Sequence, residues 1–418
     1  MLNRPVVHIY QNLLLTLLLC WSISSHSENT ELTYPIHYVV ELQPEQQRAF
    51  VEIQVEPKQL LNRIEFDITP GIISQVRANG QLNIKQGRAT WDLPNGKAKL
   101  SFYTEINHER DPGEYDAVIN SNWAIFRGDN IIPPMYAQYT DGAKADATLT
   151  FKLPKDWSVE TGWPRKTGNS FRINNPERAV DRPTGWMIAG KLATRRNTIG
   201  HTDITVSAPK GSDLRRMDAL TFLGFIWPQL EQAFGQSPDK LLIVGQGDPM
   251  WRGGLSSPNS LFLHADRSLV TEDGTSPLIH ELVHMVTRIS AIKTKTGSDD
   301  WIVEGLAEFY SIELIYRANG MPAARRSNII RRLNTRGKNV SNLRARRSHG
   351  DITARAVVLL DQLDKEIRSR SKNTYSIDDV TRELINIRKV SLQDLRSATE
   401  SLIGKNIKTL NTPLLPAI

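Results

Sequence analysis

The strongest signal in the chain is the stretch Ser276-Pro277-Leu278-Ile279-His280-Glu281-Leu282-Val283-His284. Serine followed by proline is typical of a helix start, because the serine oxygen accepts a backbone N–H of the first turn and proline fits the first helical position. One turn of that helix separates His280 from His284, so both imidazoles lie on one face and can bind a single zinc ion. Glu281 lies beside the same ion and is placed to act as general base toward a water. The stretch therefore predicts a catalytic zinc site.

A third zinc ligand is predicted on the next helix. Catalytic zinc keeps three protein ligands and leaves one position open. Glu304 lies in an amphipathic stretch that begins near residue 300, and it would complete a site of two histidines and one glutamate. Glu308 follows one helical turn later, so it faces the same way and can accept the free ring N–H of His280.

These residues resemble a known signature. His280-Glu-x-x-His284 followed by Trp301-x-x-Glu304-Gly-x-Ala is similar to that of the gluzincin zinc metallopeptidases, in particular the glycyl aminopeptidase type and, more distantly, aminopeptidase N. The spacing from the second histidine to Glu304 is one residue longer than in most aminopeptidases N. The resemblance implies a thermolysin-like, mainly helical catalytic domain with a small sheet, one zinc ion, and hydrolysis of peptide bonds.

A glycine-rich strip upstream of the helix also resembles this family. The residues for which the resemblance implies substrate contact are Gly253, Gly254, Leu255 and Ser256. We expect this loop, together with the strand through Leu261 and Leu263, to bind substrate as an added β-strand.

Two departures from the family pattern concern activity. In the related aminopeptidases a glutamate captures the α-ammonium of the substrate at the position of Ser256, and serine cannot offer the charge-assisted bond that a buried ammonium needs. The family also places a tyrosine where it stabilises the oxyanion, but no tyrosine stands between Tyr316 and Tyr375. His349 is the nearest donor in the chain and is the candidate for that role. Aminopeptidase specificity is therefore in question, and an endopeptidase, or an exopeptidase with another anchor, stays open.

A second class of function also stays open. A binding or scaffold protein of the cell envelope could keep the metal site and lose turnover, and the departures at Ser256 and at the tyrosine favour that interpretation. Retention of Glu281 favours a peptidase, because this residue is not a metal ligand and a purely structural site has no need of it. Zinc-dependent hydrolysis of a non-peptide substrate would use the same ligands.

The organisation of the chain is that of an α+β multidomain protein. Residues 28–209 alternate apolar and polar positions over short segments separated by turns, which predicts a β-rich N-terminal domain. Examples of predicted strands are 38–42, 49–55, 63–68 and 99–103. Beyond Pro209 a helical pattern appears, with two short strands before the zinc motif, and nearly everything after Pro277 reads as helix. We therefore expect the catalytic domain to span 210–418.

The first 27 residues are predicted to be a secretory signal peptide. A single cation precedes an apolar run from Leu13 to Ile23, and Ser25-His26-Ser27 fits a cleavage site. The run is about half the length of a membrane span, so we expect no transmembrane segment after cleavage. The lone cysteine, Cys20, falls in this segment, which excludes an intrachain disulfide framework. The protein is thus predicted to be exported, to the periplasm or the medium.

A basic segment covers residues 325–350, with nine arginines or lysines and no acidic residue. A solvated surface explains such a run, and contact with an anionic lipid, envelope polymer or acidic substrate is the alternative. Nucleic acid is not expected as a partner, because the segment lacks interleaved aromatic residues. The expected partner of the protein is a peptide or protein substrate.

Overall fold

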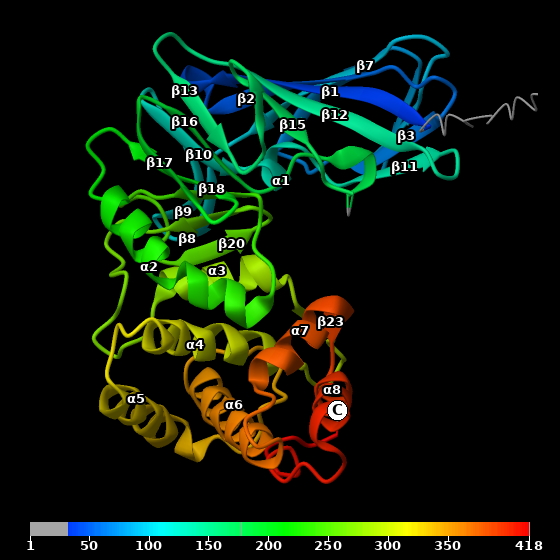
Figure 1. Cartoon of the computed structure of the whole chain (residues 1–418). Helices are drawn as coiled ribbons and strands as arrows, with labels where there is room; N and C mark the ends of the chain where they lie inside the picture. Colours follow the sequence, from blue (N-terminus) through cyan, green and yellow to red (C-terminus); the bar gives the residue numbers. More distant parts are fainter. Residues whose placement is uncertain (1–31, 177, 418) are drawn as a thin grey trace, which may run out of the picture.

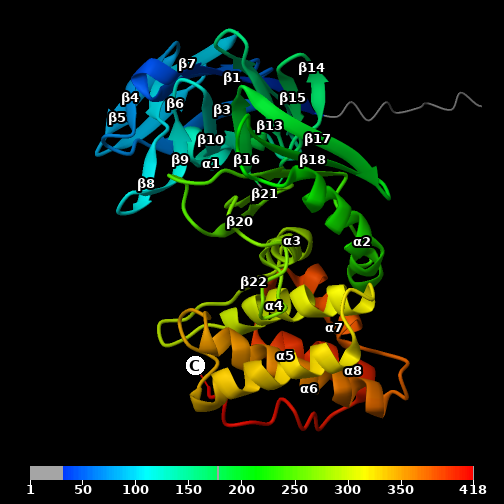
Figure 2. The same ribbon diagram turned by 90° about the vertical axis from the view of Figure 1, so that its left-hand side faces the viewer.

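The computed structural model describes residues 32–176 and 178–417. The predicted signal peptide, 1–27, lies outside the described residues and stays a prediction. Within the described part of the chain, no helix combines the length and the apolar character needed to cross a bilayer. Figures 1 and 2 show strands gathered at one end of the molecule and helices at the other.

The β-rich end is built from strands that alternate buried and partly exposed residues. β1 (Thr33–Gln43) is typical: it pairs in antiparallel fashion with the next strand, while its other edge takes a parallel partner from about 110 residues later in the chain. The strands predicted from the alternating pattern are confirmed. The remaining strands up to residue 190 are β2 Arg48–Val55, β3 Leu61–Asp67, β4 Ile73–Ala78, β5 Gln81–Lys85, β6 Arg88–Asp92, β7 Ala98–Glu105, β8 His108–Asp111, β9 Glu114–Ile119, β10 Trp123–Arg127, β11 Met135–Tyr139, β12 Lys144–Lys152, β13 Ser158–Thr161, β14 Arg165–Thr167, β15 Ser170–Ile173 and β16 Trp186–Gly190.

These strands form three sheets over the described residues, in the orders β14-β15-β12-β1-β2-β7-β4, β13-β16-β10-β9-β8 and β11-β3-β6-β5. Their inner faces share one apolar core, which includes the fully buried rings of Trp91, Phe102 and Phe126. The last residue of this core is Ala189. The core is therefore complete before the sequence reaches 190.

A further sheet connects the two ends of the molecule. Its order is β17-β18-β19-β21-β20, in which β18 pairs in parallel with β19, and β19 pairs in parallel with β21. The bounds are β17 Leu192–Ile199, β18 Thr202–Pro209, β19 Lys240–Val244, β20 Gly254–Ser257 and β21 Ser260–Leu263. The side chains of Ile204 and Val206 on β18 pack in the core of the helical end. Residues before about 190 therefore pack in the core of the β-rich end, and β18 already packs in the core of the helical end. A domain boundary at 209 would separate β18 from β19, the strand with which it pairs in parallel.

The helical end packs against this sheet. α3 lies between the sheet and α4, with α5 and α6 beyond α4 (Figure 1). The bounds of the helices and of a small two-stranded ladder are α1 Gly128–Ile131, α2 Arg216–Phe234, α3 Pro277–Thr287, α4 Asp300–Arg317, α5 Ala323–Arg336, α6 Asp351–Arg370, α7 Ile377–Ile387, α8 Leu392–Ile403, β22 Ser290–Ala291 and β23 Lys389–Val390. Three short 3₁₀ turns are described as well: η1 Pro44–Gln46, η2 Ala179–Asp181 and η3 Gly337–Asn339.

Candidate metal centre

The helix that carries the two histidines starts as the sequence predicts. The hydroxyl oxygen of Ser276 accepts the backbone N–H of Ile279 at 3.2 Å, and Pro277 occupies the first turn of α3. The apolar side chains of Leu278 and Leu282 are fully buried. Because they occupy the core-facing side of the helix, the polar face is turned toward a cleft beside α4.

The three predicted ligands converge. Nε2 of His280 lies 3.1 Å from Nε2 of His284, and the carboxylate of Glu304 lies 3.4 Å from the first ring and 3.6 Å from the second. Ligand atoms held at about 2.1 Å from a tetrahedral zinc ion are about 3.4 Å apart. The donor set and its spacing therefore fit one zinc ion, with no rearrangement of α3 or α4 beyond a few tenths of an ångström.

Glu308 holds the ring of His280 from the other side. Its carboxylate lies 3.0 Å from Nδ1, so this nitrogen is the donor and Nε2 is left to face the other ligands. Burial alone would lower the pKa of His280, but the carboxylates of Glu304 and Glu308 outweigh it and raise the pKa to about 10. Burial would raise the pKa of Glu304, but its hydrogen bonds to His280 and His284 hold it well below the usual range. The two carboxylates thus favour positive charge at His280. A divalent cation bound there would compete with the proton on the His280 ring.

Glu281 does not join the ligand cluster. Its Oε2 accepts the backbone N–H of Ser256 at 2.8 Å, which turns the carboxylate toward β20. A Cβ atom at Gly254 would lie 2.9 Å from Cγ of Glu281. Glycine is therefore required at this position for the strand to approach the glutamate so closely. A Cβ at Gly253 would overlap the ring of Trp251 at 2.0 Å, so this glycine serves the packing of the loop.

The strand beside the site differs in one respect from the prediction. β21, through Leu261 and Leu263, lies between β19 and β20, so neither of its edges is open and the prediction that substrate adds to it is wrong. β20 is instead an edge strand of the sheet in the described residues, the other being β17. β20 contains Gly254, Leu255 and Ser256, three of the four residues of the glycine-rich strip for which substrate contact is predicted.

A cleft of about 580 Å³ contains the converging residues and opens along β20. It is lined by Arg178, Leu255, Ser256, Ser257, Pro258, His280, Glu281, His284, Met285, Arg288, Ile289, Ser290, Val303 and Glu304. Among these described residues the carboxylates are those of Glu281 and Glu304. Arg178 comes from the β-rich end, close to η2, and no sequence signal pointed to it.

His349 lies apart from this cleft. It is exposed in the loop that precedes α6, and it is not among the described residues that line the cleft. The loop is tied down by its neighbour, because the backbone N–H of Ser348 donates to the carboxylate of Asp300 at 2.9 Å. The oxyanion role expected for His349 therefore stays a prediction without support from this geometry.

The basic segment is partly used inside the protein. Arg326 pairs with Glu313 and Asp361, and Arg344 pairs with Asp299. Two further arginines make exposed ion pairs. The cations that remain exposed and make no ion pair within the described residues are Arg325, Arg331, Lys338, Arg346 and Arg347.

Comparison with known proteins supports the fold. The sequence matches no protein-family model and no curated protein. Among solved structures, an aminopeptidase N family protein from Idiomarina loihiensis matches with a TM-score of 0.63 at 15% identity, over 84% of this chain and 70% of that one. An M1 zinc metallopeptidase from Deinococcus radiodurans matches with a TM-score of 0.59 at 15% identity, over 92% of this chain and 93% of that one. A glutamate-to-alanine variant of an M1 zinc metallopeptidase from the same organism was solved with a Tyr-Ser-Ala substrate bound, at the same TM-score and identity.

The chain therefore has the fold of the M1 zinc metallopeptidases, a gluzincin fold. At 15% identity the likeness concerns the fold alone. The metal cluster of His280, His284 and Glu304 is an observation on this chain itself.

Proposed function

We propose that the protein is a zinc-dependent metallopeptidase of gluzincin type that holds one zinc ion with His280, His284 and Glu304. The observation that carries the proposal is the placement of Glu281 beside the ligand cluster but outside it, with its carboxylate oriented by Ser256 N–H. A structural metal site has no use for an oriented carboxylate that does not bind the metal. A site that activates water requires one.

The residues divide the chemistry among them. Zinc, when bound, supplies a Lewis acid that polarises the scissile carbonyl and makes water more acidic. Glu281 takes the proton of the attacking water and passes it to the leaving amine. Glu308 fixes the tautomer and the orientation of His280. β20 binds the substrate backbone along its open edge, as an added strand.

Specificity follows from what the cleft lacks. An aminopeptidase must compensate the ammonium of the substrate with a carboxylate, and the cleft offers, among its described residues, only those of Glu281 and Glu304. Both are committed to the reaction or the metal. We therefore favour cleavage that does not depend on a free N-terminus. The proposed resemblance to the glycyl aminopeptidases would then extend to the fold and the metal ligands, but not to the substrate. A thermolysin-like arrangement of the catalytic helices is part of the same proposal.

A catalytically impaired binding protein of the cell envelope is the second candidate. The observation in its favour is that no tyrosine is among the described residues that line the cleft, and that His349 lies elsewhere. It would share the metal and the substrate strand, and it would differ in turnover alone.

We also propose export and an anionic contact. The leader sequence of residues 1–27 supports export, which N-terminal sequencing of the protein from its source tests directly. The five cations of the basic segment that are exposed and make no ion pair within the described residues support contact with an anionic surface of the envelope.

The decisive experiment pairs metal content with cleavage. The purified protein and its Glu281→Gln variant are analysed for zinc and incubated with a mixed peptide library whose N-termini are half free and half acetylated. One zinc in both proteins, with cleavage by the wild type alone, supports the proposal. One zinc in both with no cleavage supports the binding protein, and loss of zinc in the variant would show that Glu281 has a structural role.

A further inference from the structure

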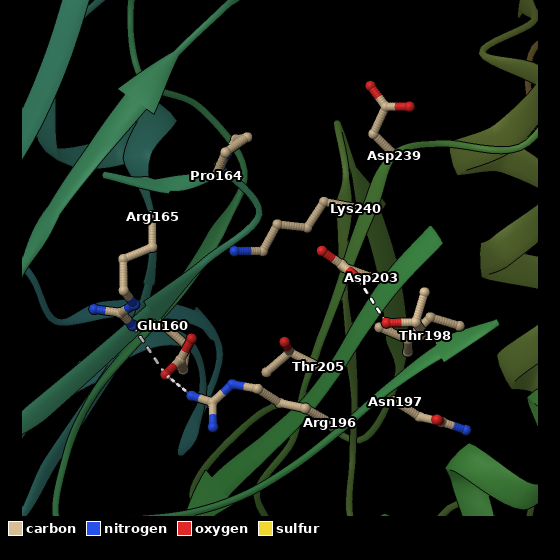
Figure 3. Close-up of a pocket in the computed structure, with 11 residues that line it drawn as sticks. Glu160, Pro164, Arg165, Arg196, Asn197, Thr198, Asp203, Thr205, Asp239 and Lys240 are labelled. Carbon is tan, nitrogen blue, oxygen red and sulfur yellow. Dashed lines mark hydrogen bonds and ion pairs between the residues drawn. The ribbon is translucent and has the colours of Figure 1, made fainter. Parts of the chain in front are cut away.

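A second polar pocket lies where the β-rich end meets the connecting sheet. Its volume is about 630 Å³, and its walls come from β13, β14, β17, β18 and the start of β19. Figure 3 shows Glu160, Arg165, Arg196 and Lys240 around one space, with Thr205 between Lys240 and Arg196. The zinc cleft shares none of these residues.

Positive charge exceeds negative charge at the inner end of this pocket. The carboxylate of Glu160 is the one buried acid, with a side chain 6% exposed. The same oxygen, Oε1, accepts a hydrogen bond from Arg165 at 3.0 Å and another from Arg196. One carboxylate is therefore shared by two guanidinium groups, which leaves a net positive charge before Lys240 is counted.

Lys240 adds a cation that has no acid of its own. Its amine donates to the carbonyl of Trp163 at 2.8 Å, and it makes no ion pair with a carboxylate in the described residues. Burial lowers the pKa of Lys240, and the nearby charges of Glu160 and Asp203 oppose that effect. A half-buried ammonium whose acceptor is a neutral carbonyl is costly unless a counter-ion completes its surroundings.

The remaining walls supply donors and a negative rim. The hydroxyl of Thr205, a residue 5% exposed, turns toward the same space as the amine of Lys240 and the guanidinium of Arg196 (Figure 3). Asp203 and Asp239 are exposed beside the start of β19, since Asp203 on β18 is the register partner of Lys240 and Asp239 precedes it. The carboxylate of Asp203 already accepts the hydroxyl of Thr198 at 2.8 Å. An anion at the inner end meets three donors, from Lys240, Arg196 and Thr205.

We propose that this pocket binds a small oxyanion, a carboxylate or a phosphate group, between Lys240, Arg196 and Thr205. The pocket is larger than one such group, so the group is one end of a larger molecule such as a short peptide or a phosphorylated metabolite. The proposal does not depend on zinc or on peptidase activity.

The pocket also lies next to the substrate strand. Gly162, in the segment between Glu160 and Trp163, is so close to the turn joining β20 to β21 that a Cβ on it would lie 2.8 Å from the carbonyl oxygen of Asn259. A ligand bound in the pocket would therefore restrain the segment around Gly162, which packs against the turn between β20 and β21.

The test measures anion affinity by thermal melting. The protein carries Glu281→Gln, so that peptides are not consumed, and it is titrated with inorganic phosphate, with trialanine, and with trialanine amide. Two further variants remove the cations, Lys240→Gln and Arg196→Gln. Arg195→Gln, at the exposed neighbouring position, changes the charge by the same amount and serves as the control.

We expect a rise in melting temperature of about 3 °C at saturating anion. Stabilisation by phosphate assigns a phosphate group, and stabilisation by trialanine but not its amide assigns a carboxylate. Both pocket variants should weaken the binding at least about tenfold, while Arg195→Gln leaves it unchanged. Equal affinities in all variants, or no stabilisation by any probe, would overturn the proposal. Arg196 is more than half exposed, so its variant folds even if Lys240→Gln does not.

Discussion

The backbone amide of Ser256 and the carboxylate of Glu281 are joined by a hydrogen bond of 2.8 Å between two elements that carry different tasks. Ser256 belongs to an edge strand of the sheet, where substrate is expected to lie. Glu281 belongs to α3, the helix that carries two of the three candidate metal ligands. The bond fixes the distance between the proposed substrate strand and the proposed general base, so small changes in the strand should act on the rate of reaction rather than on the metal.

Replacement of Gly254 by alanine tests this relationship. A Cβ atom there would be 2.9 Å from Cγ of Glu281, which forces the glutamate or the strand to shift. We expect kcat to fall by about 10- to 100-fold with zinc content unchanged, because a displacement of about 1 Å is enough to spoil the geometry of a general base. Steady-state kinetics and metal analysis check the result. Gly247→Ala, at a glycine with open space around it, is the matched control, and an equal loss there would contradict the explanation.

Replacement of Ser256 by glutamate tests why the cleft does not favour a free N-terminus. The new carboxylate would supply the acidic partner that an ammonium needs. We expect the ratio of kcat/KM for free peptides over N-acetylated peptides to rise by about tenfold or more. Ser256→Gln, which has the same length and no charge, should leave the ratio unchanged. If both variants raise it alike, charge is not the missing feature.

Removal of the carboxylate of Glu308 tests its role at His280. The variant Glu308→Gln keeps the size of the side chain and loses the charge that orients the ring. Loss of such a partner costs about 10- to 100-fold in metal affinity, and the cost should show in competition with a chromophoric chelator. Glu366→Gln, on α6, is not part of the site and should leave zinc affinity unaltered. An unchanged affinity in Glu308→Gln would mean that Glu304 alone positions the ring.

Chelation of the metal should lower stability without unfolding the protein. The ligands join α3 to α4, and zinc at about a thousand times its Kd would contribute about 4 kcal/mol to the folded state. The core around these helices is extensive, and Glu308 on α4 also pairs with His280 on α3. We therefore expect a lower melting temperature with an unchanged circular dichroism spectrum at 25 °C. Zinc should restore the melting temperature and magnesium should not, since magnesium prefers oxygen ligands. Loss of helical signal on chelation would contradict the expectation.

The exposed cations of the basic segment should bind anionic bilayers if they contact an envelope surface. Each cation near such a surface contributes about 1 kcal/mol. We expect co-sedimentation with vesicles of phosphatidylglycerol, none with phosphatidylcholine, and loss of binding at high salt. The binding should disappear when five cations are changed to glutamine, namely Arg325, Arg331, Lys338, Arg346 and Arg347. The matched control changes five exposed cations of the connecting sheet and the β-rich end, namely Arg77, Lys85, Lys155, Arg172 and Arg195. Equal loss in both variants would show that net charge, and not this surface, is responsible.

The metal centre could be predicted from the sequence because its parts are local. The spacing of His280 and His284 is set by one helical turn, and so is that of Glu304 and Glu308. Only the contact between the two helices is long-range. It could be predicted because catalytic zinc needs a third protein ligand, and Glu304 on the next helix is the candidate. The alternating strands of the β-rich end could be predicted for the same reason, since alternation of burial is a local pattern.

The long-range pairings could not be predicted in this way. The sequence shows two short strands around the glycine-rich loop, but not that β21 is enclosed and β20 is at the edge. The parallel pairing of β18 with β19 connects segments separated by a whole helix, and no local pattern records it. The same holds for the pocket near Lys240, whose walls come from strands of the β-rich end and of the connecting sheet.

The parallel pairing of β18 with β19 also limits how the protein can be divided. A fragment that starts at residue 210 would lose two strands and leave the backbone groups of β19 without partners along one side. Such an unprotected strand is a template for association with other chains. A recombinant fragment of the helical end should therefore begin before Leu192, so that it includes β17 and β18 and keeps β19 paired on both sides.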